Sequence, residues 1–453
     1  MIELLERVNG FVWGIPALIL ILGVGLYLSV RSGFVQMRLF PVALRSFIQQ
    51  FNCRGTNKDS ISPYRSLCTA LAATVGTGNI AGVAGAICIG GPGAVFWMWV
   101  CALLGMVIKF TEAVLAVHFR EKDKNGMFFG GPMQYIVGGM GKSWAPLAYV
   151  YSFFGVVASF GVGNATQVNA VVDGVNSVLH YFGGYNTWYI GFSVGVVLSV
   201  LITSVLLGGA NRIGEIAEKL IPFAAIAYIL LGLVVVVMCS DRIPGAFGQI
   251  FEGAFSPKAV TGGTIGSAFS ALRIGASRGV FTNEAGMGTA AIAHAGADVD
   301  HPVKQGMMGI IEVFLDTIII CTVTALVILC SNIPIPFGTD LGATLTTQAF
   351  SHILGNWVSI PIALFLCCFA VGTILGWGLY GARCAQFLFG EGAWRKFVFV
   401  QAFTVILGSV MQTGTVWLVS ETVNGLMAIP NLIALAFLSP TVLKLTKAYK
   451  NRT

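Results

Sequence analysis

Two short stretches combine glycine, asparagine and small residues in a way that would interrupt a helix and expose its backbone. The first is ATVGTGNIAG at residues 73–82 and the second is NEAGMG at residues 283–288; both contain the pattern N-x-A-G. Glycine is a poor helix former, and a helix end leaves backbone N–H and C=O groups without partners. Freed N–H groups bind anions, and freed carbonyl oxygens bind hard cations. The predicted chemistry is therefore ligand binding by main-chain atoms.

The surrounding segments are too apolar for a soluble protein. The chain of 453 residues is 56% hydrophobic and 10% charged, with a mean hydropathy of +0.83, whereas soluble domains carry about 25% charged residues. Uncharged runs such as 11–30, 220–240 and 317–339 are each long enough to cross a hydrocarbon core of about 30 Å as a helix. The run 11–30 lacks a signal-peptide cleavage site and is predicted to be retained. The sequence therefore predicts an all-α polytopic membrane protein.

Charged and turn-forming residues divide the chain into about eleven membrane-spanning helices within one membrane domain, residues 1–453. The expected helices are 10–31, 64–90, 93–119, 144–179, 186–207, 214–239, 262–293, 303–330, 357–388, 395–412 and 415–443. Both glycine-rich stretches fall inside expected helices. In a membrane, unpaired backbone groups are tolerated only where they line a cavity or bind a ligand.

The basic residues predict the orientation of these helices. Twenty of the 26 Lys and Arg residues fall in one set of alternating loops and the C-terminal tail; the opposite loops hold only Arg7, Arg242 and Lys258. By the positive-inside rule the N-terminus is outside and the C-terminus is cytoplasmic. The net charge of +7 is therefore interpreted as a topology signal and not as a nucleic-acid site.

The two N-x-A-G stretches occupy matching positions in two halves of the chain. Five expected helices separate the starts of their segments, so the second stretch enters the membrane from the opposite side, as an inverted repeat requires. A pair of glycine-interrupted helices in matching positions is typical of the central site of a secondary transporter. The alternative is that the glycines only allow close helix packing, because Gly78 and Gly82 also fit G-x-x-x-G.

Four longer motifs resemble the alanine or glycine:cation symporter family. They are TALAATVGTGNIAGVAGAICIGGPGAVFWMW at 69–99, FFGGPMQYI at 128–136, NEAGMGTAAIAHA at 283–295 and VGTILGWGLYG at 371–381. The resemblance implies sodium-coupled symport of alanine or glycine into the cell and a leucine-transporter-like 5+5 inverted repeat with two broken helices. Residues 63–240 and 260–443 would form the two repeats, after an extra N-terminal helix and cytoplasmic loop at 10–62.

The resemblance also implies roles for individual residues. Backbone N–H groups of Thr77 and Gly78 would bind the substrate carboxylate, and Gln167 would bind the amino end. Further substrate contacts would come from Gly275, Ala276, Gly279, Thr373, Ile374 and Trp377. Sodium would be held by the carbonyl groups of Ala72, Val75 and Phe369 together with the Thr373 hydroxyl, by analogy with the wider fold.

Each of these residues also has a purely structural interpretation. Gln167 could bond neighbouring helices, and Trp377 could be a packing residue. Asn79 and Asn283 are expected to cap half-helices. Arg273, Arg278 and Glu284 are costly in lipid, and either gating or structural ion pairing would explain them. Structural roles, or a cytoplasmic vestibule, are favoured for Lys109 with Glu112 and for Glu312 with Asp316, which have helical spacing.

The remaining function classes fit less well. The ten cysteines show no C-x-x-C and are interpreted as packing residues, so neither a disulfide, a metal site nor a cofactor is expected. No hydrolase motif or selectivity-filter signature is present, which disfavours an enzyme or a channel. A proton-coupled or sodium-independent transporter or exchanger of the same fold is the nearest alternative. The named pocket residues are uncharged, so a small neutral amino acid is favoured, and glutamine stays possible. Neither a nucleic acid nor an obligate protein partner is expected.

The charge distribution predicts a specific labelling pattern in a cell (plasma or inner) membrane. Cysteines placed at Arg38 and Lys450 should react with an impermeant reagent only from the cytoplasmic side, and a cysteine at Asp340 only from outside. The reverse pattern would overturn the topology and the inverted-repeat argument with it.

Overall fold

The computed structural model describes residues 7–10, 12–52, 61–124, 126–183, 188–255, 268–339, 341–411 and 413–451. These residues are mostly helical, as predicted; the strands among them are a short antiparallel pair, β1 (Glu121–Lys122) and β2 (Phe128–Phe129). Two residues named above, Lys258 and Asp340, lie outside the described ranges.

The helices follow the predicted segments to within a few residues for most of the chain. Among the helices inside the expected spans are α2 (Ile15–Ser32), α7 (Gly93–His118), α9 (Ala145–Phe160), α10 (Thr166–Tyr181), α11 (Trp188–Leu206), α12 (Gly209–Met238), α14 (Ala268–Asn283), α16 (Pro302–Val313), α17 (Thr322–Cys330), α19 (Ser359–Phe389), α20 (Ala393–Gly408) and α21 (Thr413–Lys450). Helices outside these spans, which the sequence did not predict, are α3 (Val35–Arg38), α4 (Phe40–Asn52), α8 (Pro132–Tyr135), α13 (Ile243–Phe255) and α18 (Ala343–Leu354).

Within the described residues, seven helical segments are long and apolar enough to cross a membrane: 93–118, 142–179, 188–206, 209–238, 302–330, 356–389 and 422–450. The four other expected spans fall short for identifiable reasons. Segments 64–90 and 262–293 are broken into shorter halves, while α2 and α20 contain 18 and 16 residues. The broken segments are thus the ones that the glycine pattern singled out.

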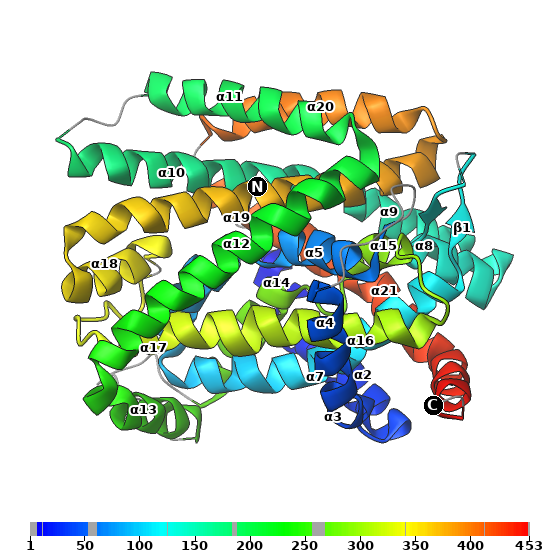
Figure 1. Cartoon of the computed structure of the whole chain (residues 1–453), viewed down its shortest axis with the longest axis horizontal. Helices are drawn as coiled ribbons and strands as arrows, with labels where there is room; N and C mark the ends of the chain where they lie inside the picture. Colours follow the sequence, from blue (N-terminus) through cyan, green and yellow to red (C-terminus); the bar gives the residue numbers. More distant parts are fainter. Residues whose placement is uncertain are drawn as a thin grey trace.

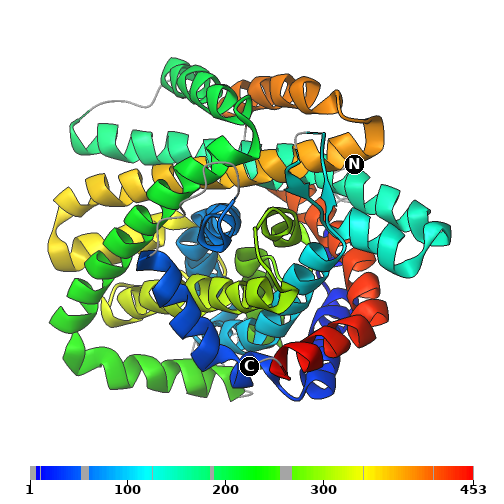
Figure 2. The same cartoon turned by 45° about the vertical axis from the view of Figure 1, so that its right-hand side comes forward.

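The two broken helices lie at the centre of the helix bundle. In Figures 1 and 2, α5 (Pro63–Thr74, blue) and α15 (Thr289–Ala295, yellow-green) are enclosed by other helices, whereas α11 and α20 lie together at the periphery. Helix α14 packs against α7, and α5 packs against both α12 and α19. The long unbroken helices therefore surround and position the broken ones.

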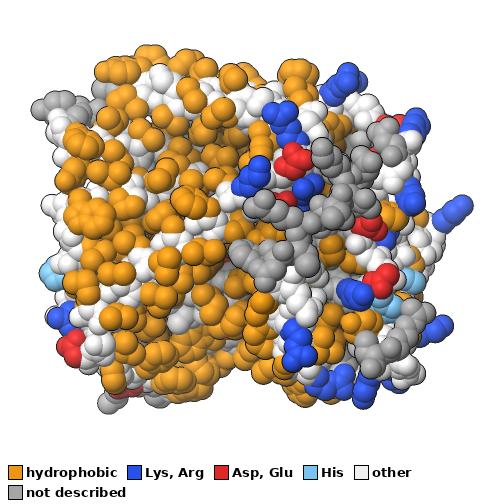
Figure 3. Space-filling view, viewed as in Figure 1, with side chains coloured by type: hydrophobic (Ala, Val, Ile, Leu, Met, Phe, Trp, Pro, Cys, Tyr) orange, Lys and Arg blue, Asp and Glu red, His pale blue; other side chains and the backbone are white. Residues whose placement is uncertain are grey.

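The surface has the distribution expected of a protein in a bilayer. A broad band of hydrophobic side chains covers the face shown in Figure 3, and most of the visible Lys and Arg side chains lie at its right-hand end. Large apolar residues such as Phe223, Val237 and Phe403 are 61–69% exposed. Exposed apolar area on this scale marks an interaction surface, here with lipid. The chain is a multi-pass membrane protein.

Candidate functional site

The first glycine-rich stretch breaks its helix where the sequence predicts. Helix α5 ends at Thr74, a single 3₁₀ turn η1 spans Thr77–Asn79, and α6 runs from Ala81 to Gly90. Between them the backbone is extended at Val75 (φ −74°, ψ 91°) and at Gly76 (φ −137°, ψ −157°). The Asn79 Oδ1 atom accepts a hydrogen bond from the Gly76 N–H at 2.9 Å, which is the capping interaction expected of this asparagine.

The second stretch is a tight turn between α14 and α15. Glu284, Gly286 and Gly288 have φ of 52°, 93° and 76°, a region that favours glycine. A Cβ on Gly288 would lie 2.4 Å from a Pro132 side-chain atom, so glycine is also required by space. Asn283 Oδ1 accepts from the Ala285 N–H at 3.0 Å. Both N-x-A-G asparagines thus stabilise the backbone of their own break.

A carboxylate of the chain itself occupies the N–H groups of the second break. Glu112 Oε1, from α7, accepts from the Gly286 and Gly288 N–H groups, both at 3.0 Å, and from Asn431 Nδ2 at 2.7 Å. Tyr135 donates its hydroxyl to Asn431. The second break therefore already contains a bound anion, the arrangement that its freed N–H groups favour.

At the first break the freed N–H groups of Thr77 and Gly78 are not bound by a carboxylate of the described residues. This break lies beside predicted site residues. The hydrogen bonds found between described residues do not use the N–H groups of Thr77 or Gly78. The Thr77 hydroxyl donates to Gln167 Oε1 at 3.2 Å. A Cβ on Gly76 would lie 2.7 Å from Thr373 Oγ1. The structure thus brings Thr77, Gln167 and Thr373 together around Gly76.

A π-helical segment positions Gln167 and the Trp377 ring. Segment η4 (Gly161–Ala165) joins α9 to α10 and places Gln167 in the first turn of α10, where its Nε2 donates to the Val162 carbonyl at 3.2 Å. Such π segments are frequent at functional sites. A Cβ on Gly163 would lie 2.2 Å from the Trp377 Cβ, so glycine allows the tryptophan to pack directly on this backbone.

Trp377 links this region to the second break. Its indole N–H donates to Glu284 Oε1 at 2.8 Å, and Thr289 donates to Glu284 Oε2 at 2.6 Å. These bonds hold Glu284, a non-glycine residue with positive φ, in an uncommon conformation. Ile374, one turn before Trp377, is fully buried and its carbonyl accepts from Gln401 Nε2 at 3.2 Å.

Three predicted substrate contacts lie elsewhere, at the interface between α14 and α7. A Cβ on Gly275 would lie 2.2 Å from the Ala94 carbonyl oxygen, and one on Gly279 would lie 3.2 Å from the Cys101 Cβ. The Ala276 carbonyl accepts from the Cys101 thiol at 3.6 Å. In this structure these small residues allow close packing of two helices.

The residues expected to hold sodium lie on the two helices that meet beside the first break. Val75 caps α5, and the Ala72 carbonyl oxygen lies 3.3 Å from a Cβ built on Gly372 of α19. The Phe369 carbonyl accepts the Thr373 hydroxyl at 3.1 Å. Within the described residues no group of three His, Cys, Asp or Glu side chains could hold a metal ion, so a cation here would depend on carbonyl and hydroxyl oxygens.

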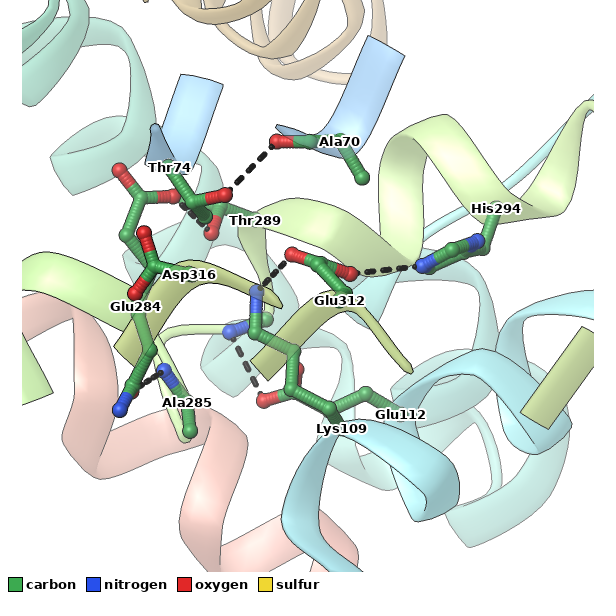
Figure 4. A network of polar contacts seen from close by, with 12 residues as sticks. Ala70, Thr74, Lys109, Glu112, Glu284, Ala285, Thr289, His294, Glu312 and Asp316 are labelled. Atoms are coloured by element: carbon green, nitrogen blue, oxygen red, sulfur yellow. Dashed lines mark hydrogen bonds and ion pairs between the residues drawn. The ribbon is translucent and has the colours of Figure 1, made fainter. Parts of the chain in front are cut away.

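Charged side chains inside the bundle pair between helices. Lys109 on α7 donates to Glu312 Oε1 on α16 at 2.8 Å, and His294 Nε2 lies 2.9 Å from Glu312 Oε2. Figure 4 shows Lys109 and His294 approaching the two oxygens of Glu312. Gln305 Nε2 donates to His294 Nδ1 at 2.7 Å. The helical spacing of Lys109 with Glu112 therefore does not reflect a direct ion pair; Lys109 fastens α7 to α16.

Two groups near the breaks are not among the site residues predicted from the sequence. Thr282 Oγ1 lies 3.4 Å from the Cβ position of Gly78. Asp316 and Thr317, in the π-helical segment η6 (Phe314–Cys321), contact Asn79 and Asn283 respectively. The sequence did contain one indication of this region, the acidic residue Asp316 within an apolar segment. An ionisable residue inside a membrane helix suggests a functional role.

Comparisons with known proteins agree with this architecture. A family model described as the sodium:alanine symporter family matches residues 1–453. The sodium/alanine symporter AgcS of Methanococcus maripaludis is 42% identical over 455 residues, covering 99% of this chain and 97% of the relative. The probable sodium/glutamine symporter GlnT of Bacillus subtilis is 34% identical over 458 residues, covering 99% of this chain and 91% of the relative.

A solved structure shows the same fold. The crystal structure of MhsT in complex with L-phenylalanine superimposes with a TM-score of 0.56 and 16% identity, covering 85% of this chain and 97% of that one. The apolar spans and the family match together define a multi-pass membrane transporter. The chain belongs to the sodium:alanine symporter family, so it is a transporter and not an enzyme, as its sequence indicates.

The role of Glu112 at the second break can be tested by substitution. Glu112→Ala leaves three buried N–H donors without an acceptor, and we expect the free energy of unfolding to fall by about 3–5 kcal/mol. Thermal unfolding of the purified protein in detergent measures this as a lower midpoint. Glu112→Gln keeps one side-chain oxygen and should lose less. A Glu112→Ala protein as stable as the wild type would contradict the assignment.

Proposed function

We propose that the protein is a sodium-coupled symporter that carries small neutral amino acids, alanine and glycine, into the cell. Membership of the sodium:alanine symporter family supports an amino-acid cation symporter. The observation that carries the finer proposal is the first helix break. The Thr77 and Gly78 N–H groups make none of the hydrogen bonds found between described residues, and the neutral side chains of Gln167 and Thr373 lie beside Gly76. Sodium would be both a transported substrate and the coupling ion.

The proposed binding mode uses both ends of a zwitterion. The Thr77 and Gly78 N–H groups would bind the carboxylate, and Gln167 would bind the amino end. Thr373, Ile374 and Trp377 would bound the pocket on the α19 side. Sodium would lie between α5 and α19, on the carbonyl groups of Ala72, Val75 and Phe369 and the Thr373 hydroxyl.

For Gly275, Ala276 and Gly279 the proposed role is indirect. Their contacts are with α7, so they would act by setting how closely α14 approaches the rest of the bundle. The neighbouring Thr282 lies near Gly78 and is the α14 side chain that we add to the proposed pocket.

The proposed topology has eleven spans, with α2 as the extra helix and a 5+5 inverted repeat formed by residues 63–240 and 260–443. The N-terminus would lie outside and the C-terminus in the cytoplasm of a cell membrane. On the face shown in Figure 3, most of the visible basic side chains lie at one end of the molecule, which supports this orientation. The matching roles of Asn79 and Asn283 in their two breaks support the repeat.

Glutamine is the alternative substrate, because a relative covering almost the whole chain is named a probable sodium/glutamine symporter. Uptake into proteoliposomes distinguishes these proposals. Inward sodium gradients should drive accumulation of radiolabelled alanine or glycine, and unlabelled glutamine should compete weakly. Equal uptake without sodium would favour a sodium-independent exchanger, and uptake driven by a proton gradient alone would favour a proton-coupled transporter.

Gln167 provides a test of the substrate site. Gln167→Ala removes a hydrogen bond to the charged substrate, so we expect alanine binding to weaken by about 1–3 kcal/mol. Isothermal titration at saturating sodium measures the change. Unchanged affinity in a correctly folded variant would remove Gln167 from the site.

Thr373 provides a test of the sodium site. Thr373→Val keeps the shape of the side chain but removes its oxygen, so half-maximal alanine uptake should need much more sodium, and saturating sodium should partly restore alanine affinity. Since coupling between two ligands is reciprocal, each titration is made with the other ligand saturating. Wild-type behaviour in both titrations would remove Thr373 from the site, and a loss of alanine affinity alone would assign it to the substrate.

A further inference from the structure

A chain of hydrogen bonds leads from the first helix break to a buried carboxylate. The Gly76 N–H donates to Asn79 Oδ1 at 2.9 Å, and Asn79 Nδ2 donates to Asp316 Oδ1 at 2.7 Å. The same Nδ2 also reaches the Asp316 carbonyl at 3.1 Å. Asn79 is therefore held at both ends, by its own break and by Asp316.

A second chain leads from the other break to the same carboxylate. The Ala285 N–H donates to Asn283 Oδ1 at 3.0 Å, Asn283 Nδ2 donates to Thr317 Oγ1 at 3.2 Å, and the Thr317 hydroxyl donates to Asp316 Oδ2 at 2.7 Å. In both chains each hydrogen bond is donated in the direction that leads to the Asp316 carboxylate. The asparagines of the two N-x-A-G motifs thus meet at one carboxylate, which connects the two breaks.

This direction of donation fits an ionised carboxylate, which accepts at both oxygens and donates at neither. Asp316 is fully buried. Within the described residues no cationic group forms an ion pair with it, because the nearby Lys109 is bonded to Glu312. Burial penalises the charge, whereas the hydrogen bonds stabilise it, so the charge state of Asp316 depends on both chains being intact.

Other ionisable groups surround this carboxylate on the elements that pack against η6. Helix α7 contributes Lys109 and Glu112, α16 contributes Glu312, and the turn after α14 contributes Glu284. Cys321 of η6 shares the Asn79 amide at 3.4 Å. Among the described residues that are at most 3% exposed, Lys109 and His294, both in contact with Glu312, accompany the four acidic side chains Glu112, Glu284, Glu312 and Asp316. An added proton at Asp316 would reduce this excess of buried negative charge.

We propose that Asp316 binds and releases a proton during transport, and that its charge state couples the two helix breaks. The proposal rests on the proposed function for its link to alanine. The step is an acid–base equilibrium in which the proton comes from solvent and returns to it. A proton on Oδ1 makes that oxygen a weaker acceptor for the Asn79 amide and so loosens the link to the Gly76 N–H. A proton on Oδ2 reverses the bond to Thr317, whose hydroxyl then accepts from Asp316 and no longer donates to it. Either event weakens the connection between the breaks.

The coupling has a definite sign. The ionised form holds Gly76 and Asn79 in the geometry that presents Thr77 and Gly78, so alanine binds this form better. Alanine binding therefore releases a proton from the protonated form, and affinity falls by up to about tenfold per pH unit below the midpoint. In Asp316→Asn the amide oxygen accepts from Asn79 and the amide nitrogen donates to Thr317, as the protonated acid would. The variant has no titrating group at this position, so its affinity should not depend on pH and should resemble that of the protonated wild type.

The experiment is isothermal titration of the full-length protein with alanine at saturating sodium, over a range of pH and in two buffers of different ionisation enthalpy. Wild type should release protons and weaken in acid, and Asp316→Asn should do neither. Asp173→Asn makes the same chemical change at an exposed position on α10 and should behave as wild type. Thr317→Val removes a donor to the ionised form, so its midpoint should move to higher pH.

Several results would overturn the proposal. The first is a wild type whose alanine affinity does not depend on pH, and the second is an Asp316→Asn protein that keeps the wild-type pH dependence. The third is a Thr317→Val protein whose midpoint is not shifted. This third measurement decides the question if Asp316→Asn fails to fold. If the wild type binds no alanine at any pH, the proposed function fails on its own. Infrared pH-difference spectra then test the proton site separately. The wild type should show a protonated carboxyl band that is missing from Asp316→Asn, and the same band in both proteins would overturn the proton site.

Discussion

The structure depends on one constraint, which is that a backbone polar group inside a membrane must have a partner. A helix satisfies this requirement automatically, and each helix break reopens it. At the second break the partner is Glu112, supplied by α7. At the first break the hydrogen bonds found between described residues do not use the N–H groups of Thr77 or Gly78, and the Gln167 and Thr373 side chains lie beside Gly76. The two N-x-A-G breaks therefore differ in how their freed backbone N–H groups are bound.

Glycine sets how closely the surrounding helices can approach these breaks. Gly163 allows Trp377 to pack on η4, and Gly275 allows α14 to pack on the backbone of α7. A side chain at either position would force neighbouring atoms apart. These close contacts bring Trp377 within hydrogen-bonding distance of Glu284, so a pocket wall predicted on α19 is connected to the turn between α14 and α15.

Much of this arrangement could be predicted from the sequence, because the signals are local. Glycine and asparagine spacing located both breaks, and uncharged runs located most of the long helices. Contacts between segments distant in the chain were less accessible. The spacing of Lys109 and Glu112 favoured one helix face, yet Lys109 bonds Glu312 on α16. The face of α14 that carries Gly275 and Gly279 could not be assigned to a pocket or to helix packing, because a glycine-rich face suits either. The contacts of Asn79 and Asn283 with η6 join distant parts of the chain and could be seen only in the three-dimensional structure.

The anchoring of the second break by Glu112 has a consequence for solvation. An anion that belongs to the chain stays at the same effective concentration whatever the surroundings contain, so the N–H groups of Gly286 and Gly288 need no replacement partner at any stage. Among the described residues the N–H groups of Thr77 and Gly78 have no such resident anion, so in the proposed binding mode they would exchange the solute for water whenever it leaves. Hydration would then be required at only one of the two breaks, and the break anchored by Glu112 would be a fixed support for movement of the other.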